Sequence, residues 1–458
     1  MIKTAILLAA GRGTKLWPYG DTWAKAAIPV GNQPVIQWQL EALHACGCKR
    51  FLVVVGHLCS QVRAAAADRV DIEWIEQSRP TGTAEALRLA WRTPISEPVL
   101  VVYGDTLFTR EDVEKLLHAY QKTKVPAALV QALGSRPSQD WLCANVQNGQ
   151  IREILGHPRQ ATHRLCGLYV LPPDFLPYLE RNPGLMTSVE VGNMPPLEAE
   201  CAESISRYLR EGHPVQAVEA GEYFADLDKP WQLLDANTLF LKYRFASLTS
   251  NQVAPTAAVS PQAEIEGKII VGNNSIIGPD VKIKGSAIIG NNTHLVDGPL
   301  IGDQTIIGDE CSIREYCKIE PGSAIGNRCV VGHAAEFGGI MMEGAYSYHY
   351  GEYWGILGRS SDLGAATVCG TLRFDDQNTQ HRIKGRRDHP GTNSANASYL
   401  GDFVRTGVNV ILMPGVKVGP YSVIGPGVIL QEDLPNGSSI FVKQELIRST
   451  WGPERYGW

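Results

Sequence analysis

Two glycines and two lysines near the amino terminus have the types and spacing of a phosphate-binding loop. Gly11 and Gly13 follow an apolar run, and Lys15 and Lys25 bracket the residues after them. Because glycine has no Cβ, consecutive backbone N–H groups can come close around a phosphate chain. Two common phosphate motifs do not fit: the stretch lacks GxxxxGK[ST], and Leu16 stands where a dinucleotide loop has its third glycine. The spacing therefore indicates a nucleoside triphosphate site of another kind.

The same stretch resembles the G-x-G-T-R…P-K signature of the sugar-1-phosphate nucleotidylyltransferases. It reads GRGTK at residues 11–15 and AK at residues 24–25. The resemblance implies that Gly11, Gly13 and Thr14 bind the nucleotide, that Lys15 clamps the departing pyrophosphate, and that Lys25 steadies charge on the α-phosphoryl group. Lys15 replaces the family arginine, which keeps the charge but loses the planar two-pronged fork.

Two aspartates are predicted to hold Mg²⁺. Asp105 directly follows a buried strand, where an aspartate is often only a cap. Beside a phosphate loop it favours Mg²⁺, which proteins hold with one or two carboxylates plus phosphate oxygens. Asp226 lies in a segment that resembles the family's W-x-D-I-x-T-P motif, and this resemblance makes it the second carboxylate. We expect Asp228 to be a surface residue.

Base and sugar contacts are predicted from further resemblances. The segment at 77–86 resembles the family's base-recognition sequence, which implies that Gln77, Gly82 and Thr83 contact a uracil or thymine; a helix cap at Thr81 or Thr83 is compatible with this. Gly104 joins the nucleotide-binding set. The segment CGLY at 166–169 resembles the strand that holds the sugar, and it implies that Gly167 and Tyr169 bind sugar. The family's Glu-Lys-Pro is replaced by Gly156-His157-Pro158, with Glu153 as a possible substitute for the glutamate.

Alternating strands and helices are expected to position these residues. Apolar runs at 51–55, 71–75 and 98–103 alternate with helical patterns at 33–46, 61–68, 79–91 and 111–121. This alternation is typical of a mostly parallel, doubly wound α/β sheet of Rossmann-like type, with ligands beyond the carboxyl ends of the strands. We expect this nucleotidylyltransferase domain to span residues 1–243, followed by a linker at 244–252.

The second half of the chain is a repeat. Aliphatic or aromatic residues occur at every sixth position from Val253 to Phe337, many of them followed by glycine. This period is the hexapeptide pattern of the left-handed parallel β-helix. Leu400, Leu412 and later residues resume it in another phase, so we predict a β-helix over 253–440 with an insertion at 373–397 and a tail at 441–458.

The fusion resembles bifunctional enzymes that acetylate an amino-sugar phosphate and then uridylylate it, especially the archaeal form. The resemblance rests on LRFD at 372–375, KGR at 384–386 and VRTGVN at 404–409. It implies that His349 takes a proton from the acceptor amine, that acetyl-CoA is the co-substrate, and that the β-helices form a homotrimer. Thr371 and Gln377 depart from the family pattern, so a purely regulatory or trimerising β-helix stays open.

Composition limits the other functions. The net charge is −5 with no basic block, which argues against general nucleic-acid binding. No apolar segment reaches the ~20 residues that span a bilayer. The ten cysteines have no CxxC pair, which indicates neither a zinc site nor a disulfide framework, so we expect the protein to reside in a reducing cytoplasm. We expect no membrane partner.

The expected activity is transfer of a nucleotidyl group from UTP or dTTP to a hexose- or N-acetylhexosamine-1-phosphate with Mg²⁺. Two alternatives remain: a bifunctional enzyme that also N-acetylates an amino-sugar phosphate, and a non-catalytic subunit that binds nucleotide sugars. A sugar phosphate is already an anion, so no general base is required for its attack on the α-phosphorus.

Overall fold

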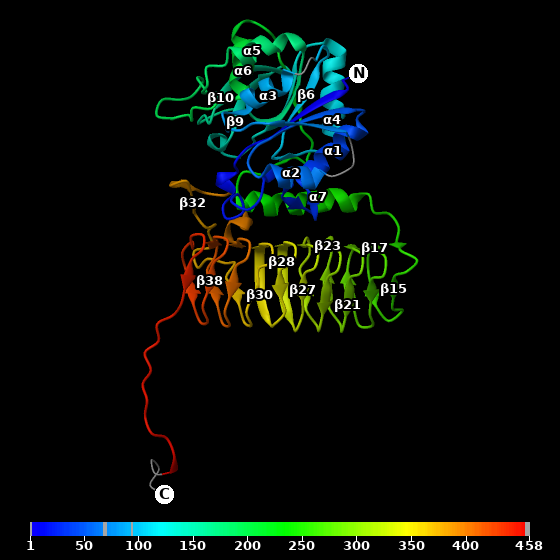
Figure 1. The fold of residues 1–458 in the computed structure, drawn as a ribbon, viewed down its shortest axis with the longest axis vertical. Coiled ribbons are helices and arrows are strands. Elements are labelled where there is room, and N and C mark those ends of the chain that lie inside the picture. Colours follow the sequence, from blue (N-terminus) through cyan, green and yellow to red (C-terminus); the bar gives the residue numbers. More distant parts are fainter. Residues whose placement is uncertain (1, 67–70, 93–94, 454–458) are drawn as a thin grey trace.

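The computed structural model describes residues 2–66, 71–92 and 95–453, which fold into two stacked parts (Figure 1). The amino-terminal part is an α/β domain, and the carboxy-terminal part is a row of short parallel strands beneath it. Within the described residues, no helix is long and apolar enough to cross a membrane. The predicted combination of a Rossmann-like α/β domain with a left-handed parallel β-helix is confirmed.

A nine-stranded mixed sheet forms the centre of the α/β domain. Its strand order is β5-β4-β1-β6-β11-β8-β12-β10-β9, with β1, β4, β5 and β6 parallel to one another and β11 antiparallel to β6 and β8. The strands are β1 Thr4–Ala9, β4 Arg50–Val55, β5 Ile72–Glu76, β6 Val99–Tyr103, β8 Ala127–Ala132, β9 Leu142–Gln147, β10 Gln150–Gly156, β11 His163–Leu171 and β12 Gln216–Glu219. The run of buried aliphatic residues in β1, β4 and β6 fits strands covered on both faces.

Helices cover the sheet, and the longest one faces the second domain. They are α1 Val35–Ala45, α2 Cys59–Ala66, α3 Thr83–Trp91, α4 Arg110–Thr123, α5 Leu176–Glu180, α6 Cys201–Arg210 and α7 Pro230–Ala246. The predicted helix at 61–68 corresponds to α2, and its positions 67 and 68 lie outside the described residues. Helix α7 runs to Ala246, so the expected linker at 244–252 begins inside a helix.

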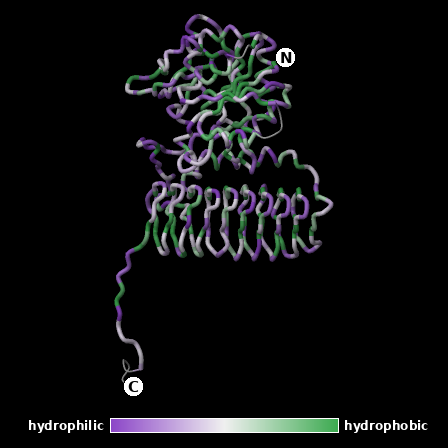
Figure 2. Tube along the Cα trace, in the orientation of Figure 1, coloured by the Kyte–Doolittle hydropathy of each residue, from purple (hydrophilic) through white to green (hydrophobic). Residues whose placement is uncertain are grey.

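Most coils of the β-helix contain 18 residues. Val253 of β14 (Gln252–Val253) pairs with Val271 of β17 (Ile269–Val271), and Ile283 of β19 (Lys282–Lys284) pairs with Ile301 of β22 (Leu300–Gly302). From Val271 to Phe337 the residues at every sixth position point inward and form one continuous apolar core; Val259 and Ile265 pack against it, whereas Val253 is exposed. Figure 2 shows hydrophobic and polar residues alternating along each coil. Three flat sides of six residues therefore explain the period.

Two coils of 16 residues follow, since Ile325 pairs with Met341 and Met341 with Leu357. A longer excursion then interrupts the repeat. Leu357 of β30 (Gly351–Leu357) pairs with Leu400 of β34 (Ser398–Leu400), 43 residues later, so the extra residues leave the coil. They form a hairpin of β32 (His381–Ile383) and β33 (Arg386–Asp388), which rises beside the α/β domain in Figure 1. Regular coils then continue to β40 (Ser439–Ile440), and the chain beyond runs away from the body as an extended tail.

The two domains share a core. One apolar cluster contains Leu16, Val35 and Phe240 from the α/β domain together with Ile340 and Tyr399 from the β-helix. Two hydrogen bonds also join the domains: the buried Tyr19 hydroxyl donates to the Ile356 carbonyl at 2.9 Å, and the Trp23 indole donates to Asp402 at 3.1 Å. This apolar contact fixes the β-helix against the face of the first domain that carries Leu16 and helices α1 and α7.

Candidate active site

A pocket of about 560 Å³ opens at the carboxyl ends of the central strands. Nine residues predicted from the sequence contribute to its lining: Gly11, Lys15, Lys25, Thr83, Gly104, Asp105, Gly167, Tyr169 and Asp226. They come from segments scattered over more than 200 positions of the chain, and the parallel strands β1 and β6 bring the first of them to one edge. This is the crevice in which open α/β sheets bind ligands.

The glycine loop lies between β1 and the short helical turn at Thr14–Leu16. Gly13 adopts φ = 63°, a left-handed conformation that favours glycine, and its carbonyl accepts a hydrogen bond from the Leu16 amide at 2.9 Å. A Cβ on Gly20 would lie 2.2 Å from the Gly13 carbonyl oxygen, so the loop folds tightly back on itself. Gly11 faces the open pocket, whereas Thr14 is exposed outside its lining.

Lys25 is the central cation of the pocket. Its ammonium group lies 2.9 Å from Asp105 and 3.2 Å from Asp228, and its side chain is largely buried. Burial alone would lower the pKa of Lys25, but the carboxylates of Asp105, Asp228 and Asp226 outweigh it and raise the pKa above its usual value. Lys25 therefore stays charged throughout the physiological range.

Asp228 belongs to this cluster, so the expectation that it is a surface residue is wrong. It pairs with Lys15 at 3.0 Å as well as with Lys25, and only 21% of its side chain is exposed. Burial raises the pKa of Asp228, but the two lysines more than reverse this and hold it well below its usual value. The feature of the sequence that could have predicted this place is the position of Asp228 two residues after Asp226, on the same extended segment.

A small two-stranded sheet brings the distant carboxylates together. Strand β13 (Ala225–Asp226) pairs antiparallel with β7 (Thr106–Leu107), so Asp226 lies opposite Thr106, and the Leu227 amide donates to the Asp105 carbonyl at 2.9 Å. Burial, followed by the charges of Asp105 and Asp228, raises the pKa of Asp226 to about 7. The site thus concentrates negative charge.

The donor set fits a divalent cation that is shared with a ligand. Among the described residues, no group of three or more histidine, cysteine or carboxylate side chains is arranged as a complete metal site. Asp105 and Asp226 offer two hard oxygen donors in a place where Asp226 repels its neighbours, and a cation there would relieve that repulsion. Mg²⁺ commonly uses one or two carboxylates together with phosphate oxygens.

The opposite end of the pocket is shaped by β11. Gly167 has φ = 72°, and a Cβ there would lie 2.8 Å from the Tyr103 ring. Tyr103 and Tyr169 meet edge to face with ring centroids 5.8 Å apart. The Tyr103 hydroxyl donates to the Thr83 hydroxyl, which in turn donates to the Glu200 carboxylate at 2.8 Å. The two tyrosine rings and this chain of hydrogen bonds form one wall of the pocket, which suits a polar ligand.

Glu200 is a pocket residue that sequence reasoning missed. It precedes α6, lines the pocket together with Glu198, and burial raises its pKa to about 7. Glu153, suggested as the substitute for the family glutamate, is exposed and instead accepts a hydrogen bond from Asn145 at 3.2 Å. Only the folded contact between α6 and the Thr83 region identifies Glu200, because its surrounding sequence carries no recognised motif.

Of the three residues predicted to contact the base, Thr83 lines the pocket, whereas Gln77 and Gly82 lie outside its lining. The buried Gln77 amide donates to the Gly82 carbonyl and the Thr81 hydroxyl, both at 3.3 Å, so it braces its own loop. Gly82 has φ = 111°, and a Cβ would meet the Ala199 backbone at 2.4 Å. Its first role in the structure is therefore to let the segment before α6 approach closely.

His349 is not part of this pocket's lining and lies on the surface of the β-helix. It is exposed after β29 (Tyr346–Ser347), with its ring 5.6 Å from His333 and 5.1 Å from Tyr348. Both neighbours contact Glu315: the Tyr348 hydroxyl donates to it at 2.6 Å, and the His333 ring lies 3.4 Å away. This is a small polar cluster with a solvent-accessible imidazole.

The chain is similar to known proteins over nearly its whole length. Residues 5–231 match the family model described as the MobA-like NTP transferase domain, and residues 248–341 match the GMPPB C-terminal domain. A bifunctional sugar-1-phosphate nucleotidylyltransferase/acetyltransferase of Sulfurisphaera tokodaii is 27% identical over 94% of this chain and 98% of its own. The bifunctional protein GlmU of Methanococcus vannielii is 28% identical over 97% and 98%. A solved UDP-glucose pyrophosphorylase of Acinetobacter baumannii covers 53% of this chain and 94% of its own at 18% identity, with a TM-score of 0.45.

Proposed function

We propose that this protein transfers a nucleotidyl group from UTP or dTTP to a sugar-1-phosphate and releases pyrophosphate. The match of residues 5–231 to the MobA-like NTP transferase domain supports the proposal. The observation that carries the proposal is the buried Lys25 ammonium group, held by Asp105 and Asp228 at the mouth of the glycine loop. A fixed cation beside a phosphate-binding loop suits charge that develops during phosphoryl transfer. The names of the two full-length relatives support the sugar-1-phosphate as acceptor.

The chemistry follows from positioning. A phosphate oxygen of the sugar-1-phosphate attacks the α-phosphorus, a new P–O bond forms, and the bond to the β-phosphate oxygen breaks, so that pyrophosphate leaves with the electron pair. Lys25 stabilises charge on the α-phosphoryl oxygens, and Lys15 binds the leaving pyrophosphate. Asp105 and Asp226 would hold Mg²⁺, which when bound neutralises phosphate charge. Gly167, Tyr169 and Glu200 line the sugar end of the pocket.

Pyrophosphate release with a substrate panel tests the proposal. UTP, dTTP, CTP, GTP and ATP would each be combined with glucose-, galactose-, glucosamine- and N-acetylglucosamine-1-phosphate in the presence of Mg²⁺. We expect turnover with a pyrimidine nucleotide and one sugar phosphate. The absence of pyrophosphate from every pair would leave the alternative of a non-catalytic subunit that binds nucleotide sugars.

A second candidate function is N-acetylation of an amino-sugar-1-phosphate by the β-helix. The observation that favours it is the exposed His349 imidazole beside His333, Tyr348 and Glu315. The acceptor amine would attack the thioester carbon of acetyl-CoA, its proton would pass to His349, and the thiolate of coenzyme A would leave. Thiol release with glucosamine-1-phosphate and acetyl-CoA tests this activity separately from the first.

We further propose that the β-helix assembles as a homotrimer. Aliphatic side chains stay exposed on its outer strands: Ile411 of β36 (Ile411–Leu412) is 37% exposed and stacks on Ile429 of β39 (Ile429–Leu430), which is 55% exposed. Burying such a row between subunits would be favourable. Light scattering at micromolar concentration should give the mass of a trimer, and the mass of a monomer would contradict this assembly.

A further inference from the structure

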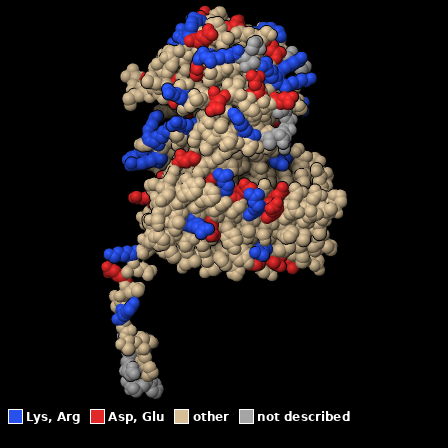
Figure 3. Space-filling view, in the orientation of Figure 1, with Lys and Arg blue, Asp and Glu red and all other residues tan. Residues whose placement is uncertain are grey.

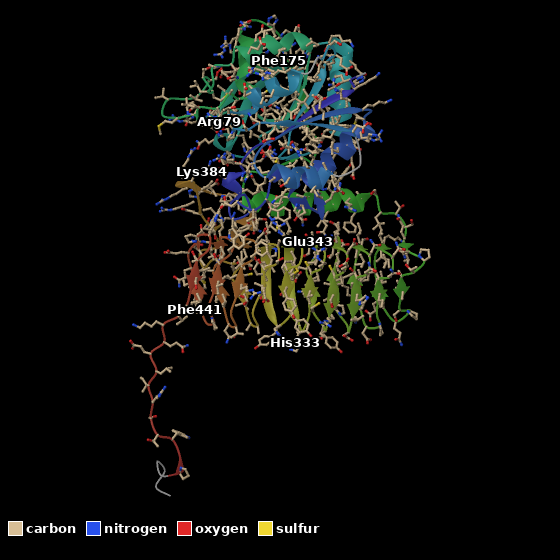
Figure 4. The ribbon with its side chains drawn as sticks, viewed as in Figure 1. Arg79, Phe175, His333, Glu343, Lys384 and Phe441 are labelled. Carbon is tan, nitrogen blue, oxygen red and sulfur yellow. The ribbon has the colours of Figure 1, made fainter. Side chains whose placement is uncertain are left out.

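The hairpin inserted into the β-helix reaches the nucleotidyltransferase pocket. Lys384 in its turn and Arg386 in β33 line the pocket, although every other lining residue lies between Leu8 and Asp228. Figure 4 shows Lys384 on the hairpin beside the α/β domain, and Figure 3 shows basic side chains gathered at that edge of the molecule. The carboxy-terminal half therefore adds positive charge to a site otherwise built from the amino-terminal half.

The hairpin is fixed to the catalytic domain at its base. Trp231 at the start of α7 stacks on the His381 ring with centroids 4.5 Å apart. Lys229 forms an ion pair with Asp388 in β33 and lies 3.6 Å from Asp140 in the pocket wall. Asp235 of α7 accepts hydrogen bonds from Thr392 and Ser394, which follow the hairpin. These contacts hold the turn in one place relative to the pocket.

The His381 ring, which is part of this anchor, stays in a single protonation state near neutral pH. Burial, together with the charge of Lys417, lowers the pKa of His381 to about 4. Its ring lies 2.9 Å from the Lys417 ammonium group through Nδ1 and 2.8 Å from the Ala395 carbonyl through Nε2. A neutral ring can accept at Nδ1 and donate at Nε2, which satisfies both contacts near neutral pH.

The two hairpin cations are not paired with carboxylates among the described residues, unlike Lys15 and Lys25. Lys15 and Lys25 are paired with Asp228 and Asp105. Lys384 and Arg386 are exposed, and among the described residues neither takes part in an ion pair. A triphosphate brings more negative charge than two already paired lysines neutralise. The free donors on the hairpin are therefore the ones available for its outer phosphates.

Arg386 and Lys15 both line the pocket, as does His157. His157 is a shared neighbour: its pKa is lowered first by burial and then by the positive charges of Lys15 and Arg386. Lys15 is the residue assigned to the departing pyrophosphate. An arginine there would also restore the planar fork that Lys15 lacks relative to the family pattern.

We propose that Lys384 and Arg386 bind the β- and γ-phosphate oxygens of the nucleoside triphosphate, so that the β-helix half completes the nucleotide site of its own chain. The inference rests on the proposed nucleotidyl transfer. It assigns the inserted hairpin to substrate binding, and it makes the affinity for pyrophosphate depend on a segment more than 350 residues away from the glycine loop.

The test compares two double variants of the full-length protein. Lys384→Ala with Arg386→Ala removes the cations that line the pocket. Arg382→Ala with Arg387→Ala removes the same charge from a cross-strand pair of the same hairpin that does not line the pocket. We expect the first variant to raise the KM for the nucleoside triphosphate and for pyrophosphate in the reverse reaction by about 10-fold or more, as for loss of charged hydrogen bonds. The control should stay within about 2-fold of wild type.

Calorimetry with inorganic pyrophosphate and MgCl₂ gives a readout that does not require turnover. Wild type should bind pyrophosphate, and the pocket-facing variant should bind it about 10-fold more weakly. Equal losses in both variants, or a KM increase confined to the sugar-1-phosphate, would overturn the assignment. If no substrate pair reacts but the difference in pyrophosphate affinity persists, the proposed function fails while the hairpin site stands; if wild type does not bind pyrophosphate, the hairpin site fails.

Discussion

The two halves of this molecule gather chemical groups in opposite ways. In the α/β domain, Lys25, Asp105 and Asp228 come from three distant segments and meet within 3.2 Å in a largely buried pocket. On the β-helix, His349 and its neighbours lie on adjacent coils at the surface. A sheet edge can surround a ligand with one chain, whereas a flat coil face needs a second surface to enclose anything.

This contrast predicts different sensitivities in the two halves. A substitution in the enclosed pocket should act on transition-state charge, and one on the coil face should leave the first reaction untouched. The inserted hairpin is the exception, because it carries Lys384 and Arg386 from the repeat half to the enclosed pocket.

Replacing Lys25 should have the largest effect. Lys25→Gln keeps much of the side-chain volume but removes the charge between Asp105 and Asp228, so we expect kcat for pyrophosphate release to fall roughly 10³-fold. Lys282→Ala is the matched control, since Lys282 is a half-exposed lysine paired with Glu264 on the β-helix. Unfolding midpoints of both variants should be recorded. A folded Lys25→Gln variant with wild-type kcat would remove Lys25 from the mechanism.

His349→Ala should separate the two halves. We expect thiol release from acetyl-CoA to fall roughly 10²-fold or more, as for loss of a general base. Pyrophosphate release should be unchanged, because His349 is not part of the pocket lining. Both rates would be measured on one preparation, with His294→Ala, an exposed histidine of β21 (His294–Val296), as the control. Unchanged thiol release would indicate that the β-helix serves assembly alone.

Asp226→Asn should alter the requirement for Mg²⁺. We expect the Mg²⁺ concentration for half-maximal pyrophosphate release to rise about 10-fold, because one of two charged oxygen donors is lost. Asp21→Asn is a control outside the pocket lining. An unchanged Mg²⁺ titration curve in the Asp226 variant would exclude it as a ligand.

Glu200→Gln should have the smallest effect, visible mainly as a change in pH dependence. Because burial raises the pKa of Glu200 to about 7, its neutral form stabilises the folded protein at low pH, and this contribution is lost as pH rises through 7. Denaturant titrations should show wild type losing stability relative to Glu200→Gln between about pH 5 and pH 8. Parallel pH curves for the two proteins would mean that Glu200 does not titrate in this range.

The sequence predicted the parts of the fold that rest on periodicity and local motifs. The six-residue period defined the β-helix core because every coil repeats the same inward position, and the glycine loop with Asp105 marked the strand ends. The sequence did not predict that Asp228 and Glu200 belong to the pocket. The place of Asp228 depends on the β13–β7 pairing, and that of Glu200 depends on the approach of Ala199 to Gly82. The basic hairpin was visible in the sequence, but only the folded chain shows which surface it meets.

Transfer of label from UTP carrying ³²P at the α-position tests the central claim most directly. With the reactive sugar-1-phosphate and Mg²⁺, wild type should move the label into a nucleotide sugar and release unlabelled pyrophosphate, and Lys25→Gln should not. The same experiment with label at the α-position of dTTP covers the second donor. If wild type forms no labelled nucleotide sugar from either donor with any sugar phosphate of the panel, the pocket around Lys25 does not carry out nucleotidyl transfer.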